Sequence, residues 1–105
     1  MDFEIVFIPE ARKEFKKLDN SIKQLVADKI SKLKNNPHIG EPLGNKLERN
    51  LTGYYKIYVF NKKIRIVYEI IDKFSIVKII TISKREKFEA YFLADKKKLI
   101  KDELD

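Results

Sequence analysis

The sequence predicts a small α+β domain in which two helices cover one face of a mainly antiparallel sheet. Apolar residues recur at helical spacing within residues 9–35, whereas beyond Gly53 that period gives way to segments rich in branched and aromatic residues. Of the 105 residues, 44% are hydrophobic and 37% are charged, which is typical of a globular protein with one modest core. We therefore expect residues 1–105 to form a single domain.

A strand followed by two helices is expected in residues 2–36. The stretch DFEIVFI indicates a strand over residues 2–8, and Pro9 then suits the first turn of a helix. The apolar stripe of this helix consists of Ala11, Phe15 and Leu18. Asp19-Asn20-Ser21 ends it and supplies capping oxygens for a second helix. The apolar face of that second helix consists of Ile22, Leu25, Val26, Ile30 and Leu33. Asn35-Asn36-Pro37 ends it, because the residue before a proline avoids the helical region.

The rest of the chain is expected to form a loop, three strands and a C-terminal helix. Residues 37–53 hold two of the three prolines and all three glycines, which indicates a loop with a short strand near Lys46–Arg49. Strands are predicted at residues 54–60, 63–71 and 75–83, and their short connections require antiparallel pairing. The chain is expected to become helical again from Glu86.

Composition excludes several kinds of site. The chain has no cysteine, which excludes disulfides and thiolate metal sites, and its single histidine argues against a metal site built from histidines. No metal or small cofactor is expected. The 23 Lys and Arg residues against 16 Asp and Glu residues give a formal charge of +7, which favours a polyanionic or acidic partner.

No segment indicates export or membrane insertion. The N-terminal stretch carries Asp2 and Glu4 within its apolar part, unlike a signal peptide. The longest apolar runs, such as IVKII, are far shorter than the roughly 20 residues of a membrane span. We expect a soluble, cytoplasmic protein with no membrane partner.

Two cations interrupt the predicted hairpin GYYKIYVFNKKIRIVYEI. If Asn61-Lys62 forms a two-residue turn, Tyr58 lies opposite Arg65 and Lys56 opposite Val67. Because side chains alternate across a strand, Lys56, Tyr58 and Arg65 then share the face that the helices leave uncovered. Aromatic rings beside cations suit RNA, through base stacking and phosphate binding. The alternative is a solvated sheet face, which is the simpler interpretation of Lys56 taken alone.

The segment ISKREKFEAYF holds a second candidate. Ser83 and Glu86 have capping-box spacing, which predicts that Lys84 and Arg85 lie at the start of a helix. Cations oppose the helix dipole there, and backbone N–H groups beside two cations form a phosphate site. A solvated charge pair is the equally simple alternative.

Three further polar residues are not expected to act in catalysis. His38 lies in the loop rich in proline and glycine and is expected to be a loop residue. Glu69 and Glu86 are expected to be structural partners and not an acid–base pair.

The hairpin and the ISKREKFEAYF segment together resemble the RelE/ParE superfamily of toxins from toxin–antitoxin pairs. The resemblance rests on RIVYEI in the second strand of the hairpin, on KRE with a tyrosine beyond it, and on the upstream order of strand, helical hairpin and loop. It covers nearly the whole chain. It implies a RelE-like fold with an N-terminal strand, a helical hairpin packed on a mainly antiparallel sheet, and a C-terminal helix.

The resemblance also implies roles for particular residues. RelE-type members are ribosome-dependent mRNA endonucleases, and the positions that match their RNA-cleaving residues are Lys56, Arg65, Arg85 and Tyr91. Tyr58 occupies the position of a second lysine that is implicated as general base. Further contacts with RNA, including ribosomal RNA, are expected from Lys46, Tyr58, Lys84 and Lys87. Arg65 and Arg85 would bind the phosphate. Lys56 would be the general base or a third phosphate ligand, and Tyr91 would orient a base or the 2′-hydroxyl.

Several functions stay open at this point. The first is a metal-independent mRNA endonuclease that uses the RNA 2′-hydroxyl as nucleophile and has a cognate antitoxin protein as its partner. The alternatives are a ParE-like poison of DNA gyrase without chemistry of its own, and a weakened nucleic-acid-binding toxin homologue. The residues matched above favour the nuclease, whereas Tyr58 at the second-lysine position favours the alternatives.

Overall fold

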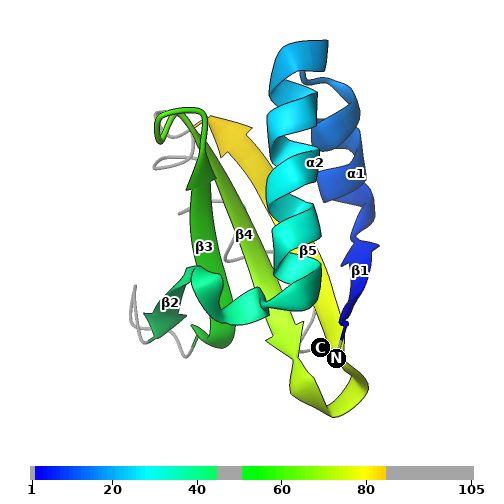
Figure 1. Ribbon diagram of the computed structural model, residues 1–105, viewed down its shortest axis with the longest axis vertical. Coiled ribbons are helices and arrows are strands. Elements are labelled where there is room, and N and C mark those ends of the chain that lie inside the picture. Colours follow the sequence, from blue (N-terminus) through cyan, green and yellow to red (C-terminus); the bar gives the residue numbers. More distant parts are fainter. Residues whose placement is uncertain (1, 45–50, 85–105) are drawn as a thin grey trace.

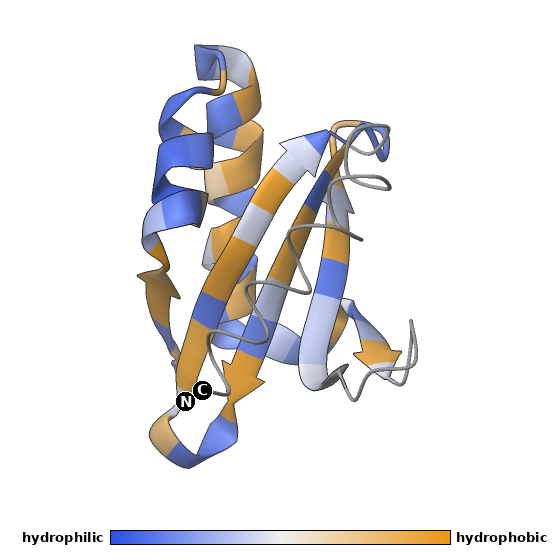
Figure 2. Ribbon diagram, turned by 180° about the vertical axis from the view of Figure 1, so that it is seen from behind, coloured by the Kyte–Doolittle hydropathy of each residue, from blue (hydrophilic) through white to orange (hydrophobic). Residues whose placement is uncertain are grey.

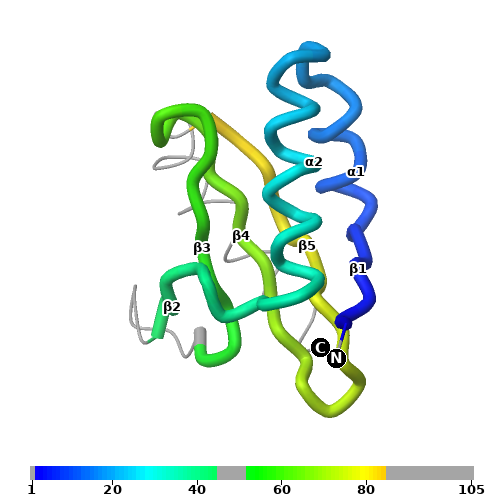
Figure 3. Tube along the Cα trace, viewed as in Figure 1, coloured from blue at the N-terminus to red at the C-terminus, as the bar shows by residue number. Residues whose placement is uncertain are grey.

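Five strands form one sheet, and two helices pack on one of its faces (Figure 1). The computed structural model describes residues 2–44 and 51–84. Along the chain the elements are β1 (Glu4–Phe7), α1 (Pro9–Lys16), α2 (Asn20–Asn35), the 3₁₀ turn η1 (Pro37–Ile39), β2 (Glu41–Gly44), β3 (Leu51–Val59), β4 (Ile64–Ile71), the 3₁₀ turn η3 (Asp72–Phe74) and β5 (Ile76–Lys84). The Cα trace in Figure 3 shows α1 and α2 side by side. The fold is therefore α+β, as the sequence predicts.

The strands lie in the order β1-β5-β4-β3-β2. The pairs β3–β4 and β4–β5 are antiparallel, which confirms the prediction, whereas β1 pairs in parallel with β5 and makes the sheet mixed. The first strand, Glu4–Phe7, is shorter than the predicted 2–8. The strand β2, Glu41–Gly44, lies in a segment that the sequence predicts as loop. The short strand predicted near Lys46–Arg49 and the helix predicted from Glu86 lie outside the described residues.

Both helices begin where the sequence predicts. Pro9 occupies the first turn of α1, where its missing N–H costs no helical bond. Asp19 caps α2, since its Oδ1 accepts hydrogen bonds from Ile22 N–H (3.1 Å) and Ser21 Oγ (2.8 Å). The bond from Ile22, and then that from Ser21, lowers the pKa of the Asp19 carboxyl. Within the described residues, neither helix is long and apolar enough to cross a bilayer.

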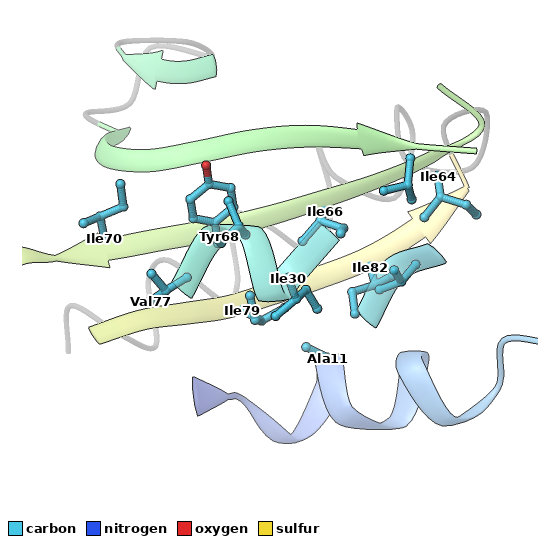
Figure 4. Packing of buried hydrophobic residues seen from close by; sticks show 12 residues of the cluster. Ala11, Ile30, Ile64, Ile66, Tyr68, Ile70, Val77, Ile79 and Ile82 are labelled. Atoms are coloured by element: carbon cyan, nitrogen blue, oxygen red, sulfur yellow. The ribbon is translucent and has the colours of Figure 1, made fainter. Parts of the chain in front are cut away.

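The main core lies between the helices and the sheet. Its buried members are Ala11, Val26, Ile30, Leu33, Val59, Ile64, Ile66, Tyr68, Ile70, Val77, Ile79 and Ile82. Figure 4 shows the side chains of alternate β4 residues, from Ile64 to Ile70, gathered in this layer. The prediction that Leu25 belongs to the buried face of α2 is wrong, because Leu25 lies beside the stripe formed by Val26 and Ile30 and is 43% exposed. A second cluster on the other sheet face contains Leu43, Tyr54, Val67 and Ile80.

A carboxylate attaches α1 to the edge of β5. The parallel pairing of β1 with β5 ends at Ile79. Beyond it, Glu14 Oε1 accepts hydrogen bonds from Ile82 N–H and from Thr81 Oγ1, both at 3.0 Å. The side chain of Glu14 thus takes the place of a pairing strand at this edge.

Tyr68 connects the sheet to the loop that leads into β2. Its ring is fully buried, and its hydroxyl donates to Pro37 O (2.7 Å) and accepts from Gly40 N–H (3.1 Å). Burial is the main cause that raises the pKa of Tyr68 to about 12, with the Gly40 bond opposing it and nearby Tyr55 adding to it. The neutral hydroxyl therefore holds residues 37–40 against the sheet and determines where β2 begins.

We expect the contribution of this hydroxyl to stability to be lost at high pH. The unfolded chain releases the Tyr68 proton near the usual pKa of 10.0, whereas the folded chain holds it to about 12. Between these values the unfolded state binds fewer protons, so the free energy of unfolding falls as pH rises. Urea denaturation of the wild type and of Tyr68→Phe should therefore differ most below pH 10, and the difference should shrink toward pH 12. A difference that is constant across this window would contradict the expectation.

Candidate functional site

The β3–β4 hairpin has the register that the sequence predicts. Tyr58 pairs with Arg65, and Lys56 pairs with Val67. Strand alternation places Lys56, Tyr58 and Arg65 on the sheet face opposite the helices, because the neighbouring Ile66 belongs to the main core and Tyr55 packs against that core. Figure 2 views this face, where hydrophilic bands interrupt β3 and β4. The predicted convergence of these three side chains is confirmed.

The turn that sets this register is tight. Lys63 N–H donates to Phe60 O at 3.0 Å, and Asn61 and Lys62 both have positive φ, 53° and 65°. Positive φ at both central residues is the signature of a type I′ turn, whose twist matches that of the flanking strands. Phe60 also has positive φ, 55°, so regular pairing ends one residue before it. The predicted turn at Asn61-Lys62 and its register are therefore confirmed, but Phe60 and Lys63 do not pair as strand residues, so four residues connect the strands.

Tyr58 lies at the centre of the cluster. Arg65 Nη2 donates to Tyr58 Oη at 2.8 Å, and the guanidinium carbon lies 5.0 Å from the centre of the Tyr58 ring. Lys56 Nζ lies 5.8 Å from the same centre. Both cations therefore lie close to the Tyr58 ring, and the Tyr58 hydroxyl orients one of them, Arg65.

A carboxylate that the sequence interpretation did not single out joins this cluster. Glu41 in β2 pairs with Lys56 in the sheet, and its Oε2 lies 3.9 Å from Lys56 Nζ. The Lys56 side chain is 15% exposed and that of Glu41 is 71% exposed. The sequence analysis assigned Glu41 to a loop. Proline is tolerated at the edge of a sheet, so Pro42 is the one sequence signal that could have indicated an edge strand at Glu41. The pairing of β2 with β3 brings it to Lys56 across 15 positions of sequence.

The structure corrects two expectations at the end of β5. Ser83 pairs with Arg65 and Lys84 pairs with Ile64, so both are strand residues. The predicted capping role of Ser83 and the predicted place of Lys84 at a helix start are wrong, because pairing with β4 continues through both positions. Lys84 is exposed, and alternation directs it away from the face that Arg65 shares. The buried Ser83 Oγ has no hydrogen-bond partner among the described residues and adds a hydroxyl opposite Arg65.

The expectation that His38 is a loop residue is confirmed. His38 is exposed within η1, and its Nδ1 lies 3.4 Å from the hydroxyl of Tyr55, on the face away from the cluster. Among the described residues, no three His, Asp or Glu side chains lie close enough to share a metal ion.

The cluster suits recognition of a phosphodiester. An arginine offers a planar pair of donors to phosphate oxygens, and Lys56 adds a second positive charge. Glu41 supplies a carboxylate that can accept a proton, and the Tyr58 ring offers a stacking surface. The combination of two cations, one carboxylate and one aromatic ring is therefore compatible with RNA chemistry.

Comparison with known families agrees with this interpretation. Residues 5–98 match the family described as ParE-like toxin of type II bacterial toxin–antitoxin systems. The chain belongs to this toxin family. Four predicted site residues of this ParE-like toxin lie outside the described residues, namely Lys46, Arg85, Lys87 and Tyr91.

Relatives of this ParE-like toxin cover almost its whole length. A RelE-like toxin protein of Escherichia coli is 36% identical over 97 residues, which are 92% of this chain and 98% of the relative. The mRNA interferase toxin RelE of Escherichia coli strain K12 is 32% identical, with the same coverage of both chains. These matches place the chain in the RelE/ParE superfamily, as the sequence resemblance implies.

Solved structures show the same fold. A mutant of Escherichia coli RelE in the free state has a TM-score of 0.72 and 27% identity, and the match covers 92% of this ParE-like toxin and 98% of RelE. The toxin in the intact Escherichia coli RelBE toxin–antitoxin complex has a TM-score of 0.65 and 29% identity, and the match covers 78% of this chain and 95% of that one. The RelE-like fold expected from the sequence is confirmed.

Proposed function

We propose that this ParE-like toxin is the toxin of a toxin–antitoxin pair and cleaves mRNA on the ribosome. The observation that carries the proposal is the convergence of Lys56, Tyr58 and Arg65 on one sheet face, with Glu41 beside them. The relative named mRNA interferase toxin RelE, 32% identical over 92% of the chain, supports the same activity. We further propose that residues 1–105 form a single toxin domain that acts in the cytoplasm.

The proposed reaction is a transesterification at one phosphodiester. The RNA 2′-hydroxyl attacks the adjacent phosphorus while the bond from phosphorus to the 5′-oxygen breaks. One proton leaves the 2′-hydroxyl, and one proton reaches the departing 5′-oxygen. Arg65 stabilises the charge that develops on the non-bridging oxygens, and Arg85 is proposed to assist it. Tyr91 is proposed to orient a base or the 2′-hydroxyl.

The ion pair at the site divides the remaining roles between two residues. Lys56 and Glu41 lie 3.9 Å apart, so the positive charge on the lysine is supported by a carboxylate. A charged lysine is a phosphate ligand, whereas the carboxylate of the pair is the group able to take the 2′-hydroxyl proton. We propose Lys56 as the phosphate ligand and Glu41 as the proton acceptor, with Tyr58 in the place of a second lysine as an orienting group for Arg65.

Glu41→Gln is therefore expected to lower kcat for mRNA cleavage by about tenfold to a hundredfold, since it removes a proton acceptor and keeps the shape of the side chain. Single-turnover cleavage on ribosomes that carry a defined mRNA measures this loss. A cleavage rate equal to that of the wild type would assign the proton transfer to another group.

The proposed partner is an antitoxin protein with an acidic segment. The net charge of +7 favours such a segment. The Escherichia coli relative that is 29% identical was solved in a complex of toxin with antitoxin. Segments of this kind commonly fold as they bind. Binding over Lys56 and Arg65 would neutralise the cluster and block access of RNA.

Gyrase poisoning is the alternative that Tyr58 at the second-lysine position left open, and the relatives named mRNA interferase RelE do not favour it. Primer extension on cellular mRNA after induction separates the two. Cuts in phase with codons support the nuclease, whereas intact mRNA with damaged DNA supports the gyrase poison. A triple alanine variant of Lys56, Arg65 and Arg85 that cleaves ribosome-bound mRNA like the wild type would refute the proposed site.

A further inference from the structure

A groove of about 510 Å³ runs between α2 and the tip of the β3–β4 hairpin. Its volume lies within the range of about 300–1,000 Å³ that is typical of small-ligand sites. The residues that matter here are Leu25, Lys29 and Lys32 on α2 and Tyr58, Phe60 and Lys62 on the hairpin. Neither the family comparison nor the proposed cleavage chemistry uses the α2 side of this groove.

The walls of the groove combine apolar surface with positive charge. Leu25 is 43% exposed and Phe60 is 39% exposed, although large apolar side chains are usually covered. Lys29, Lys32 and Lys62 contribute three cations to the lining. Among the described residues that line the groove, Asp28 is the one acidic residue, and it already accepts a hydrogen bond from Gln24 Nε2 at 2.9 Å. The charge of the groove is therefore complementary to a polyanion.

The turn fixes the backbone of Phe60 at the hairpin tip. Phe60 has a φ of 55°, which is uncommon for a bulky residue, and its carbonyl accepts the turn hydrogen bond from Lys63. Lys63 Nζ lies 5.2 Å from the centre of the Phe60 ring. An exposed aromatic ring next to cations is the combination that stacks a base and binds its phosphate.

The groove and the cluster at the proposed cleavage site share Tyr58. Tyr58 lines the groove and also accepts the hydrogen bond from Arg65. The cluster lies on the sheet face away from the helices, whereas α2 forms one wall of the groove. In the described residues, β2 pairs with β3 only as far as Lys56, so the edge of β3 is open beside Tyr58. A polynucleotide whose phosphate lies at Arg65 would pass around this open edge to reach Phe60.

We infer that the groove binds the single-stranded mRNA segment next to the cleaved phosphodiester, with a base stacked on Phe60 and phosphates on Lys29, Lys32 and Lys62. This inference rests on the proposed nuclease function, because it assigns the flanking part of the same substrate. The groove increases the affinity for mRNA and takes no part in the chemical step. An acidic protein segment would also fit the charge, but the link to Arg65 through Tyr58 favours RNA.

The first test replaces Phe60 with the photo-crosslinking residue p-benzoylphenylalanine in the full-length toxin, bound to ribosomes that carry a defined mRNA. We expect a crosslink to the mRNA within a few nucleotides of the cut. The same variant is also examined in the toxin–antitoxin complex. The inference would be overturned if the ribosome sample gave crosslinks to ribosomal RNA alone, if only the antitoxin were crosslinked, or if neither sample gave a crosslink.

The second test is kinetic. The triple variant Lys29→Ala, Lys32→Ala, Lys62→Ala should raise KM for mRNA by about tenfold and leave kcat unchanged. The control is the triple variant Lys13→Ala, Lys16→Ala, Lys17→Ala, which removes the same number of positive charges on and just after α1. This control should keep the wild-type KM. Phe60→Leu should raise KM whereas Phe60→Tyr should not, because only the tyrosine still stacks. Equal KM values in the groove and α1 variants, or a fall in kcat alone, would overturn the inference.

A failure of the proposed function gives a different result. If the wild type does not cleave mRNA on ribosomes, the groove is tested by equilibrium binding of a 2′-O-methyl RNA oligonucleotide, which the proposed reaction cannot cleave. Weaker binding by Phe60→Leu than by Phe60→Tyr would then support the groove without the nuclease. Equal binding by the two variants would refute the groove.

Discussion

Arg65→Ala is expected to slow cleavage of ribosome-bound mRNA by about a hundredfold to a thousandfold. Arg65 is 8% exposed, and Tyr58 accepts one of its donors at 2.8 Å, so its guanidinium is held in place before substrate arrives. A pre-oriented charge aimed at the phosphate acts most strongly in the transition state, where the oxygens carry the most charge. The effect should therefore appear in kcat, measured by single-turnover cleavage with saturating ribosomes.

Three further variants separate this role from a structural one. Arg65→Lys keeps the charge and loses the planar pair of donors, so it should recover only part of the rate. Tyr58→Phe keeps the ring and loses the hydroxyl that orients Arg65, and its loss should be smaller than that of Arg65→Ala. Lys78→Ala removes a cation from the same sheet face, at a position paired with Glu69, and should retain the wild-type rate. A folded Arg65→Ala protein with the wild-type kcat would refute the proposed role.

Gly40→Ala is expected to lower the free energy of unfolding by about 3 kcal/mol. A Cβ at this position would lie 2.3 Å from Tyr68 Oη and 2.7 Å from Lys56 O, closer than real Cβ atoms approach other heavy atoms. The loop must then move away from the sheet, which breaks the bonds of Tyr68 to Gly40 and Pro37. Urea denaturation measures the loss. Because Glu41 is the next residue, mRNA cleavage should fall as well.

The clash can be tested by a double-mutant cycle. Tyr68→Phe removes the oxygen nearest the new Cβ but leaves Lys56 O in place, so Gly40→Ala should cost less in the Tyr68→Phe background. Gly44→Ala is the control, since a Cβ there meets nothing within 4 Å and only the φ of 60° opposes it. It should cost about 1 kcal/mol. Equal costs at Gly40 and Gly44 would show that the contact with Tyr68 is unimportant.

Local patterns predicted much of the fold and three of the four residues of the proposed cleavage site, namely Lys56, Tyr58 and Arg65 but not Glu41. Pro9 and Asp19 begin the helices where expected, because a ring without N–H and a capping carboxylate act within one turn of the chain. The prediction failed for Leu25, because helical periodicity shows which residues share the apolar stripe of α2 but does not show which residues at the edge of that stripe contact the sheet. It also failed for Ser83 and Lys84, because strand pairing with β4 outweighed the capping pattern.

The sequence by itself determined that the side chains of Lys56, Tyr58 and Arg65 lie on the same face of the sheet. Their register depends on a two-residue turn and on strand alternation, which operate between residues close in the chain. Only the tertiary structure decided that β1 lies beside β5, that Glu41 reaches Lys56, and that a groove opens beside Phe60. Such contacts join segments far apart in the chain, as Tyr68 joins Pro37 across 31 positions. Their geometry follows from how the helices, loop and sheet pack together, and no local pattern carries that information.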